Sequence, residues 1–238
     1  MENKDDRIIQ IAPTEDKQPI RADKKIPWLV LALSTIALIV IIFAFVNEAR
    51  TKRDAAEGTQ PLHRSEIQND LNGLDWIEQD FLPINPFSRP GLELGEITGI
   101  VIHNIGNPDT TAEQNRNFFA NLADTEERHA SSHFIVCLDG SVIQCVPVDE
   151  IAYASNQRNT DTLSIEVCHP DDTGRFTNES YNAAVRLTAW LCITYGLTSE
   201  DVIRHFDVQG KECPRYFVEN EDAWEIFKSD VARELGRN

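Results

Sequence analysis

The chain has 238 residues, a formal net charge of −17 and a hydrophobic fraction of 41%. This length and apolar fraction are sufficient for one sizeable packed domain with additional segments. The acidic excess argues against a nucleic-acid partner, because phosphate groups repel a negatively charged surface. A high net charge also keeps a protein soluble, which is a sufficient explanation for the acidic composition.

An uncharged apolar run occupies residues 26–46, with Trp28 near its start and Lys24 and Lys25 before it. As a helix this run would be about 31 Å long, which matches the hydrocarbon core of a bilayer. A cleaved signal peptide is the alternative, but the run is long for one, a polar segment precedes it and no clear cleavage site follows. We therefore expect an uncleaved transmembrane signal anchor.

Three further segments surround this run. Residues 1–25 are polar and charged, which predicts a disordered cytoplasmic tail. Residues 47–75 read as a tether, and residues 76–95, with their prolines and aromatic residues, as an extended segment packed on the outside of the domain. Basic residues lie on both sides of the apolar run, so the positive-inside rule does not orient it.

The remaining residues, 96–238, are expected to form the folded domain. Residues 97–104 are apolar and rich in β-branched side chains, which predicts a buried strand. Thr110 and Glu113 match a capping box and predict that a helix begins there.

A β-hairpin is predicted around the Asp139-Gly140 dipeptide. A two-residue turn there would pair Cys137 with Val142, so no disulfide is expected between Cys137 and Cys145. The chain has five cysteines, which is too few and too odd a number for a disulfide framework.

The second half of the domain alternates strands and helices. Residues 162–170 and 201–206 read as strands. Helical spacing of apolar residues predicts helices over 177–196, ending at Gly196, and over 221–236. Strands mixed with helices around one hairpin predict an α/β fold with a mixed central β-sheet flanked by helices.

Three potential metal ligands accompany these strands. His103 and His205 each fall at the end of a predicted strand, and Cys213 follows His205 by eight residues. Two imidazoles and one thiolate, with a fourth position open to water, are typical of a catalytic zinc site. Taken singly, each histidine is more often a hydrogen-bonded structural residue and the cysteine a core residue, but their joint occurrence favours the metal.

Four blocks carry a family resemblance: "GIVIHNIG", "SSHFIV", "SIEVCHP" and "VIRHFDVQGKECP". In this order, and over residues 95–232, the chain resembles the zinc-dependent N-acetylmuramoyl-L-alanine amidases of the amidase type 2 and peptidoglycan recognition protein superfamily. The resemblance implies the fold of that superfamily, Zn²⁺ bound by His103, His205 and Cys213, and Lys211 as the group that stabilises the oxyanion. It also implies a peptidoglycan or muropeptide substrate, cleaved between N-acetylmuramic acid and L-alanine.

The general base has two positions in similar proteins. Some use a tyrosine where this chain has Ser132, and others use a glutamate where it has Glu166. Alternation along the strand places Ser164, Glu166 and Cys168 on one face, and a carboxylate on a buried strand is costly unless it is used or paired. We therefore expect Glu166 to be catalytic, with a purely structural carboxylate as the alternative.

Substrate contacts are expected from four further residues: His133, Tyr153, Asn156 and Arg215. His133 could instead pack within the sheet, and Arg215 could face solvent. Recognition proteins of this fold that bind muropeptides without cutting them are the alternative function, but they typically lack the cysteine ligand, which is present here as Cys213. Because peptidoglycan lies outside the cytoplasmic membrane, the resemblance orients the predicted signal anchor. We therefore expect a single-pass protein of the cytoplasmic membrane with its catalytic domain outside.

Overall fold

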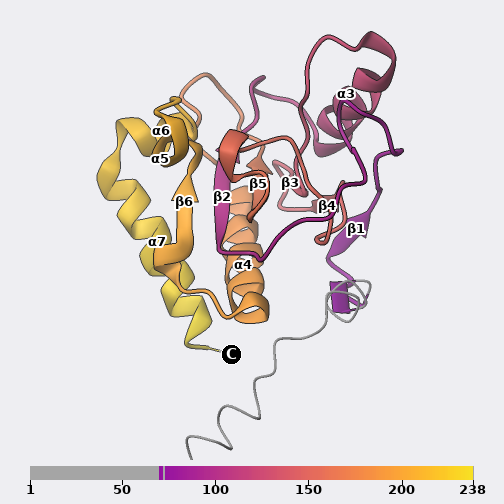
Figure 1. Cartoon of the computed structure of the whole chain (residues 1–238). Helices are drawn as coiled ribbons and strands as arrows, with labels where there is room; N and C mark the ends of the chain where they lie inside the picture. Colours follow the sequence, from indigo (N-terminus) through magenta and orange to yellow (C-terminus); the bar gives the residue numbers. More distant parts are fainter. Residues whose placement is uncertain (1–69, 72, 238) are drawn as a thin grey trace, which may run out of the picture. The chain divides into compact units, whose positions relative to one another are not determined.

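The computed structural model describes residues 70, 71 and 73–237 (Figure 1). The predicted cytoplasmic tail, the apolar run 26–46 and most of the predicted tether lie outside these residues. Within the described part of the chain, no helix is both long and apolar enough to cross a membrane.

A six-stranded mixed sheet forms the centre of the domain, in the order β1-β4-β3-β5-β2-β6 (Figure 1). Neighbouring strands are parallel except for β3 and β4, which are antiparallel. The mixed sheet flanked by helices confirms the predicted fold class. The strands are β1 (Ile77–Gln79), β2 (Gly99–Asn104), β3 (Phe134–Val136), β4 (Val142–Gln144), β5 (Thr162–Val167) and β6 (Val202–Arg204).

Helices cover both faces of the sheet. The described helices are α3 (Ala112–Thr125), α4 (Asn178–Tyr195), α5 (His205–Gln209), α6 (Arg215–Glu219) and α7 (Glu221–Leu235), with short 3-10 turns at Asn156–Arg158 and Ser199–Asp201. Leu163, Ile165 and Val167 of β5 belong to the core cluster that contains α4 and α7. A second cluster holds Ile135, Cys168 and the buried face of α3. Alternation in β5 therefore turns Glu166 away from the main core, toward the α3 side.

Helix ends follow their capping residues. The cap of α3 lies one residue later than predicted, at Thr111 instead of Thr110. The Thr111 hydroxyl accepts from the Gln114 backbone N–H at 3.1 Å, and the Gln114 side chain accepts from the Thr111 N–H, which completes a capping box without Glu113. At the end of α4, Gly196 adopts a left-handed φ of 66°, as predicted for the residue that stops this helix.

The hairpin register differs by one residue from the prediction. Val136, not Cys137, lies opposite Val142, and the Cys137 N–H donates to the Ser141 carbonyl at 2.8 Å. The physical reason is Gly140, whose φ of 85° adds a left-handed residue to the loop and makes it three residues long instead of two. All five cysteines are free thiols.

The folded domain begins before residue 96. Within the predicted outer segment 76–95, β1 is an edge strand paired with β4, and Leu82 and Leu94 are buried. Leu71, at the end of the predicted tether, is fully buried in the main core cluster. The composition predicted a segment on the outside of the domain, because prolines and charged residues surround its few apolar residues. In the structure, pairing of this segment with the edge of the sheet allows those apolar residues to be buried.

Candidate metal centre

Three potential ligands converge at one edge of the sheet, where parallel strands end. Ile102 of β2 lies opposite Arg204 of β6, so the next residues, His103 and His205, lie side by side with ring centroids 4.7 Å apart. Cys213, in the loop before α6, places its Sγ 3.8 Å from His103 Nδ1. The ligand atoms of all three buried residues lie within 4.8 Å of one another, close enough to share one metal ion.

Hydrogen bonds orient the two imidazoles. Nε2 of His103 lies 3.1 Å from the Ser155 hydroxyl, which leaves Nδ1 facing Cys213. Nε2 of His205 lies 2.9 Å from Nε2 of the Gln209 side-chain amide. Nδ1 of His205 is buried and has no hydrogen-bond partner among the described residues. An unpaired buried nitrogen is costly, and a metal ligand role accounts for it.

A buried arginine holds the segment that carries two of these residues. Arg204 donates to the Phe217 carbonyl at 3.0 Å and forms ion pairs with Asp207 and Glu221. The backbone N–H of Phe206 donates to the Cys213 carbonyl at 2.9 Å. These contacts join the start of α5 to the loop before α6 and thereby hold His205 and Cys213 close to each other.

Burial sets the charge of the ligands in the metal-free protein. It lowers the pKa of His103 well below its usual value, and the neighbouring His205 and Lys211 lower it further. It also lowers the pKa of His205 to about 4 and raises the pKa of the Cys213 thiol to about 12. Neutral imidazoles are in the form that binds a metal, whereas the thiol must lose its proton, so metal affinity increases with pH.

Glu166 completes the site from β5, directly opposite His103 in the parallel register. Its Oε1 lies 4.0 Å from His103 Nδ1, and its buried Oε2 has no hydrogen-bond partner within residues 70, 71 and 73–237. Burial raises the pKa of this carboxyl to about 8, against a smaller opposing effect of Lys211. A carboxylate with a purely structural role would accept hydrogen bonds from its neighbours. The surroundings of Glu166 therefore favour a role in proton transfer.

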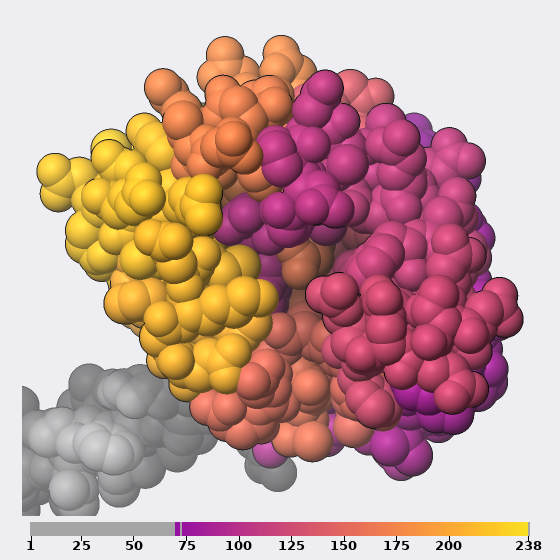
Figure 2. All heavy atoms as spheres, turned by 90° about the horizontal axis from the view of Figure 1, so that it is seen from above, coloured from indigo at the N-terminus to yellow at the C-terminus, as the bar shows by residue number. Residues whose placement is uncertain are grey.

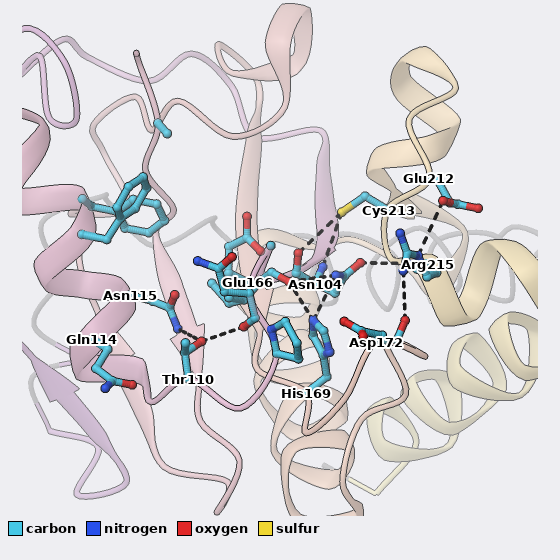
Figure 3. Close-up of a pocket in the computed structure, with 18 of the residues that line it drawn as sticks. Asn104, Thr110, Gln114, Asn115, Glu166, His169, Asp172, Glu212, Cys213 and Arg215 are labelled. Atoms are coloured by element: carbon cyan, nitrogen blue, oxygen red, sulfur yellow. Dashed lines mark hydrogen bonds and ion pairs between the residues drawn. The ribbon is translucent and has the colours of Figure 1, made fainter. Parts of the chain in front are cut away.

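A groove of about 700 Å³ opens beside Glu166 and Cys213, which both line it. Figure 2 shows it from above as a hollow between the yellow C-terminal segments and the magenta segments around α3. Cys213 and Arg215 lie on one side of the groove, Asn115 lies on the other, and Glu166 lies between them (Figure 3). Lys211 and Phe118 also line the groove.

His133 does not reach this groove, contrary to the expected substrate contact. Its side chain is 1% exposed, with Nδ1 2.9 Å from the Ser164 hydroxyl and Nε2 2.9 Å from the Glu150 carbonyl. Burial lowers its pKa to about 4. The two ring nitrogens of His133 therefore link β5 to the loop after β4. This arrangement matches the alternative expectation, that His133 packs within the sheet.

Tyr153 and Asn156 also lie away from the main groove. Tyr153 packs edge-on against His129, with ring centroids 5.2 Å apart, in a separate shallow hollow. The Asn156 side chain donates to Gln209, which in turn contacts His205. Asn156 therefore supports a potential metal ligand instead of lining the space for a substrate.

Arg215 and Lys211 are cations at the groove wall. The Arg215 guanidinium donates to the Asp172 carbonyl at 3.0 Å and lies 3.5 Å from the Glu212 carboxylate (Figure 3). Lys211 is exposed, and its charge lowers the pKa values of Glu166 and His205. Both cations therefore face the space that a substrate would occupy.

Sequence reasoning missed the residues that orient the ligands. Gln209 carried a signal, because it follows His205 by four residues and thus lies on the same face of a helix. Ser155 and Asn104 carried none, since Ser155 reaches His103 from a distant loop. The backbone N–H of Asn104 lies 3.4 Å from Cys213 Sγ, a contact that depends on tertiary structure alone.

The sequence profile of the family described as N-acetylmuramoyl-L-alanine amidase (Amidase_2) matches residues 93–216, which is more than half of the chain. The matched region contains all three potential metal ligands together with Glu166 and Lys211. The chain belongs to this family.

Two curated relatives come from Bacillus licheniformis. A probable N-acetylmuramoyl-L-alanine amidase is 33% identical over 174 residues, which cover 68% of this chain and 48% of the relative. The N-acetylmuramoyl-L-alanine amidase CwlL is 32% identical over 174 residues, covering 67% of this chain and 48% of the relative. The chain thus matches about half the length of each relative.

Solved structures share the fold. The catalytic domain of XlyA superposes with a TM-score of 0.56 at 25% identity, covering 65% of this chain and 98% of that domain. The hydrolase AmiA of Staphylococcus aureus, in complex with its ligand, gives a TM-score of 0.52 at 20% identity, covering 74% of this chain and 93% of AmiA. The latter likeness establishes the fold alone.

The raised pKa of Glu166 predicts the pH dependence of stability in the metal-free protein. Folding raises this pKa from 4.5 to about 8, so the native state keeps a proton that the unfolded state releases. The stability that this proton contributes is complete below pH 4.5 and is lost as the pH rises through 8. Glu166→Gln should therefore gain stability relative to wild type between pH 5 and pH 7, by about 2 kcal/mol.

Urea unfolding in the presence of a chelator measures this difference at both pH values. Glu219→Gln, at an exposed glutamate, is the matched control and should show no comparable change. A Glu166→Gln stability difference that is equal at pH 5 and pH 7 would contradict the protonated, buried carboxyl.

Proposed function

We propose that this chain is a zinc-dependent peptidoglycan hydrolase that cleaves the amide bond between N-acetylmuramic acid and L-alanine. The observation that carries the proposal is the convergence of two histidines and a cysteine within 4.8 Å, beside a buried carboxyl group at the floor of a groove. Membership of the amidase family supports the reaction, and the names of the relatives support the bond that is cleaved.

The donor set fits Zn²⁺. His103, His205 and Cys213 supply two nitrogens and a sulfur, the set of a three-ligand catalytic zinc site. The unpartnered Nδ1 of His205 is the atom in this structure that a metal would satisfy. A zinc ion bound there would act as a Lewis acid toward the substrate carbonyl and would acidify the attacking water.

Glu166 serves as the proton carrier. It takes a proton from the attacking water and delivers it to the nitrogen of the leaving L-alanine. Burial raises its pKa, whereas the Lys211 charge lowers it, and a bound cation would lower it further. These opposing effects bring the carboxyl group into the range where it can both accept and donate a proton near neutral pH.

Lys211 stabilises the developing negative charge. Its ammonium group lies at the groove wall, close enough to the site to affect the pKa values of His205 and Glu166. A fixed cation beside a carbonyl oxygen that becomes negatively charged lowers the barrier. Arg215, which also lines the groove, is suited to a carboxylate of the stem peptide.

Two substitutions test the mechanism by their contrast. Cys213→Ser should lose the bound zinc, because a ligand thiolate is absent, and with it the release of L-alanine amino termini from purified cell wall. Lys211→Gln should keep one zinc per chain but lower kcat by about 10²-fold or more. Metal analysis of the purified proteins and an amino-terminus assay measure both effects.

The same assay separates the enzyme from a binding module of the same fold. Equal release of amino termini by the wild-type protein and by Cys213→Ser would contradict the zinc-dependent mechanism. Wild-type protein that binds muropeptide but releases no amino termini would establish the binding module.

Ser155 provides a test of ligand orientation. Because its hydroxyl lies 3.1 Å from His103 Nε2 and orients the ring, Ser155→Ala should weaken zinc binding by about 10-fold or more. Competition with a chromogenic chelator measures this affinity without any need for activity. Ser141→Ala, at an exposed serine of the hairpin loop, is the control, and equal affinities of the two variants would contradict the role of Ser155.

The location follows from the proposed substrate. The apolar run 26–46, read as a signal anchor, would place the N-terminus in the cytoplasm and the catalytic domain outside, near the cell wall. Protease added to intact cells stripped of their wall should then digest the domain. Protection of the domain until the cells are lysed would overturn this topology.

A further inference from the structure

Two cysteines far apart in the sequence end neighbouring parallel strands. Val136 of β3 lies opposite Val167 of β5, and the N–H of Cys168 donates to the Val136 carbonyl at 2.9 Å. Cys137 and Cys168 are the next residues of the two strands, so they continue this register. Residues directly opposite on adjacent strands are about 5 Å apart at Cα, which lies within the range of disulfides.

Both side chains point to the same side of the sheet. Alternation places Cys137 on the face of Ile135, and Cys168 on the face of Glu166. Cys168 belongs to the cluster beneath α3, and Cys137 packs against that cluster. Burial raises the pKa of Cys168, and the neighbouring Cys137 thiol adds to this increase.

The first turn of α3 covers the two thiols and donates to both. The backbone N–H of Ala112 lies 3.4 Å from Cys137 Sγ, and the Asn115 side-chain amide lies 3.7 Å from Cys168 Sγ. Cys137 is partly exposed and Cys168 is fully buried, so only Cys137 is open to a reagent in solution.

We propose that Cys137 and Cys168 are an oxidisable dithiol that closes to an intramolecular disulfide. With a low-molecular-weight disulfide as oxidant, the Cys137 thiolate attacks one sulfur, forms a mixed disulfide and releases one thiolate. Cys168, after losing its proton, attacks the Cys137 sulfur and releases the second thiol. In total, the two cysteines lose two electrons and two protons, and the oxidant is reduced to two thiols.

The bridge would link elements that shape the groove. Glu166 precedes Cys168 by two residues on the same face of β5, and Gln114 and Asn115 of α3 line the groove. A bond between β3 and β5 beneath α3 would therefore fasten the wall and floor of the groove to each other. This inference goes beyond the proposed hydrolase activity and does not depend on it.

Oxidation of the full chain by oxidised glutathione tests the proposal. Mass spectrometry of peptides prepared without reductant should show the Cys137 and Cys168 peptides joined, with the loss of two hydrogen atoms. Because the bond closes a loop of about 30 residues, the thermal midpoint should rise by on the order of 5 °C over the reduced protein.

Two variants establish the order of the steps. Cys168→Ala should stop at a glutathione adduct on Cys137, since the resolving thiol is absent. Cys137→Ala should leave Cys168 unmodified, since that thiol is buried. A wild-type protein that stops at a Cys137 adduct, or in which Cys168 pairs with another cysteine, would overturn the proposal, as would a folded protein in which both thiols stay free.

Discussion

The parallel pairing of β2 with both β5 and β6 is the constraint on which the site depends. In this register, His103 lies opposite Glu166 on one side and beside His205 on the other. Parallel strands end at a common edge, so three residues separated by more than 30 positions in the sequence meet there without any loop having to position them. A slip of one residue in either pairing would turn a ligand or the carboxyl group to the opposite face.

Burial gives this edge its chemical character. The two imidazoles are kept neutral and the carboxyl group is kept protonated in the metal-free protein, because low polarity disfavours charge. Among the buried side-chain atoms without a hydrogen-bond partner in the described part of the chain, His205 Nδ1 and Glu166 Oε2 lie at this edge. A fold retains such atoms where a ligand or a reaction uses them, and Ser155 and Gln209 hold the remaining nitrogens in the matching orientation.

Much of the secondary structure could be predicted because local signals were strong. The strands around His103 and Glu166 and the long helices lie where apolar periodicity placed them. The errors arose where the deciding contact was not local. Gly140 lengthened the hairpin loop, β1 paired with a strand 65 residues away, and His133 turned into the sheet instead of the groove. Phe118, on the groove wall, carried no sequence signal.

By itself, the sequence determined the family, the strand and helix types and the residues able to bind a metal, since each depends on residue identity and short spacing. Only the tertiary structure decided which of them meet. It joined His103 to Ser155, left Tyr153 outside the groove and placed Cys137 beside Cys168 instead of Cys145. The physical reason is that strand order and register are set by burial of the whole sheet, which no single segment of the chain encodes.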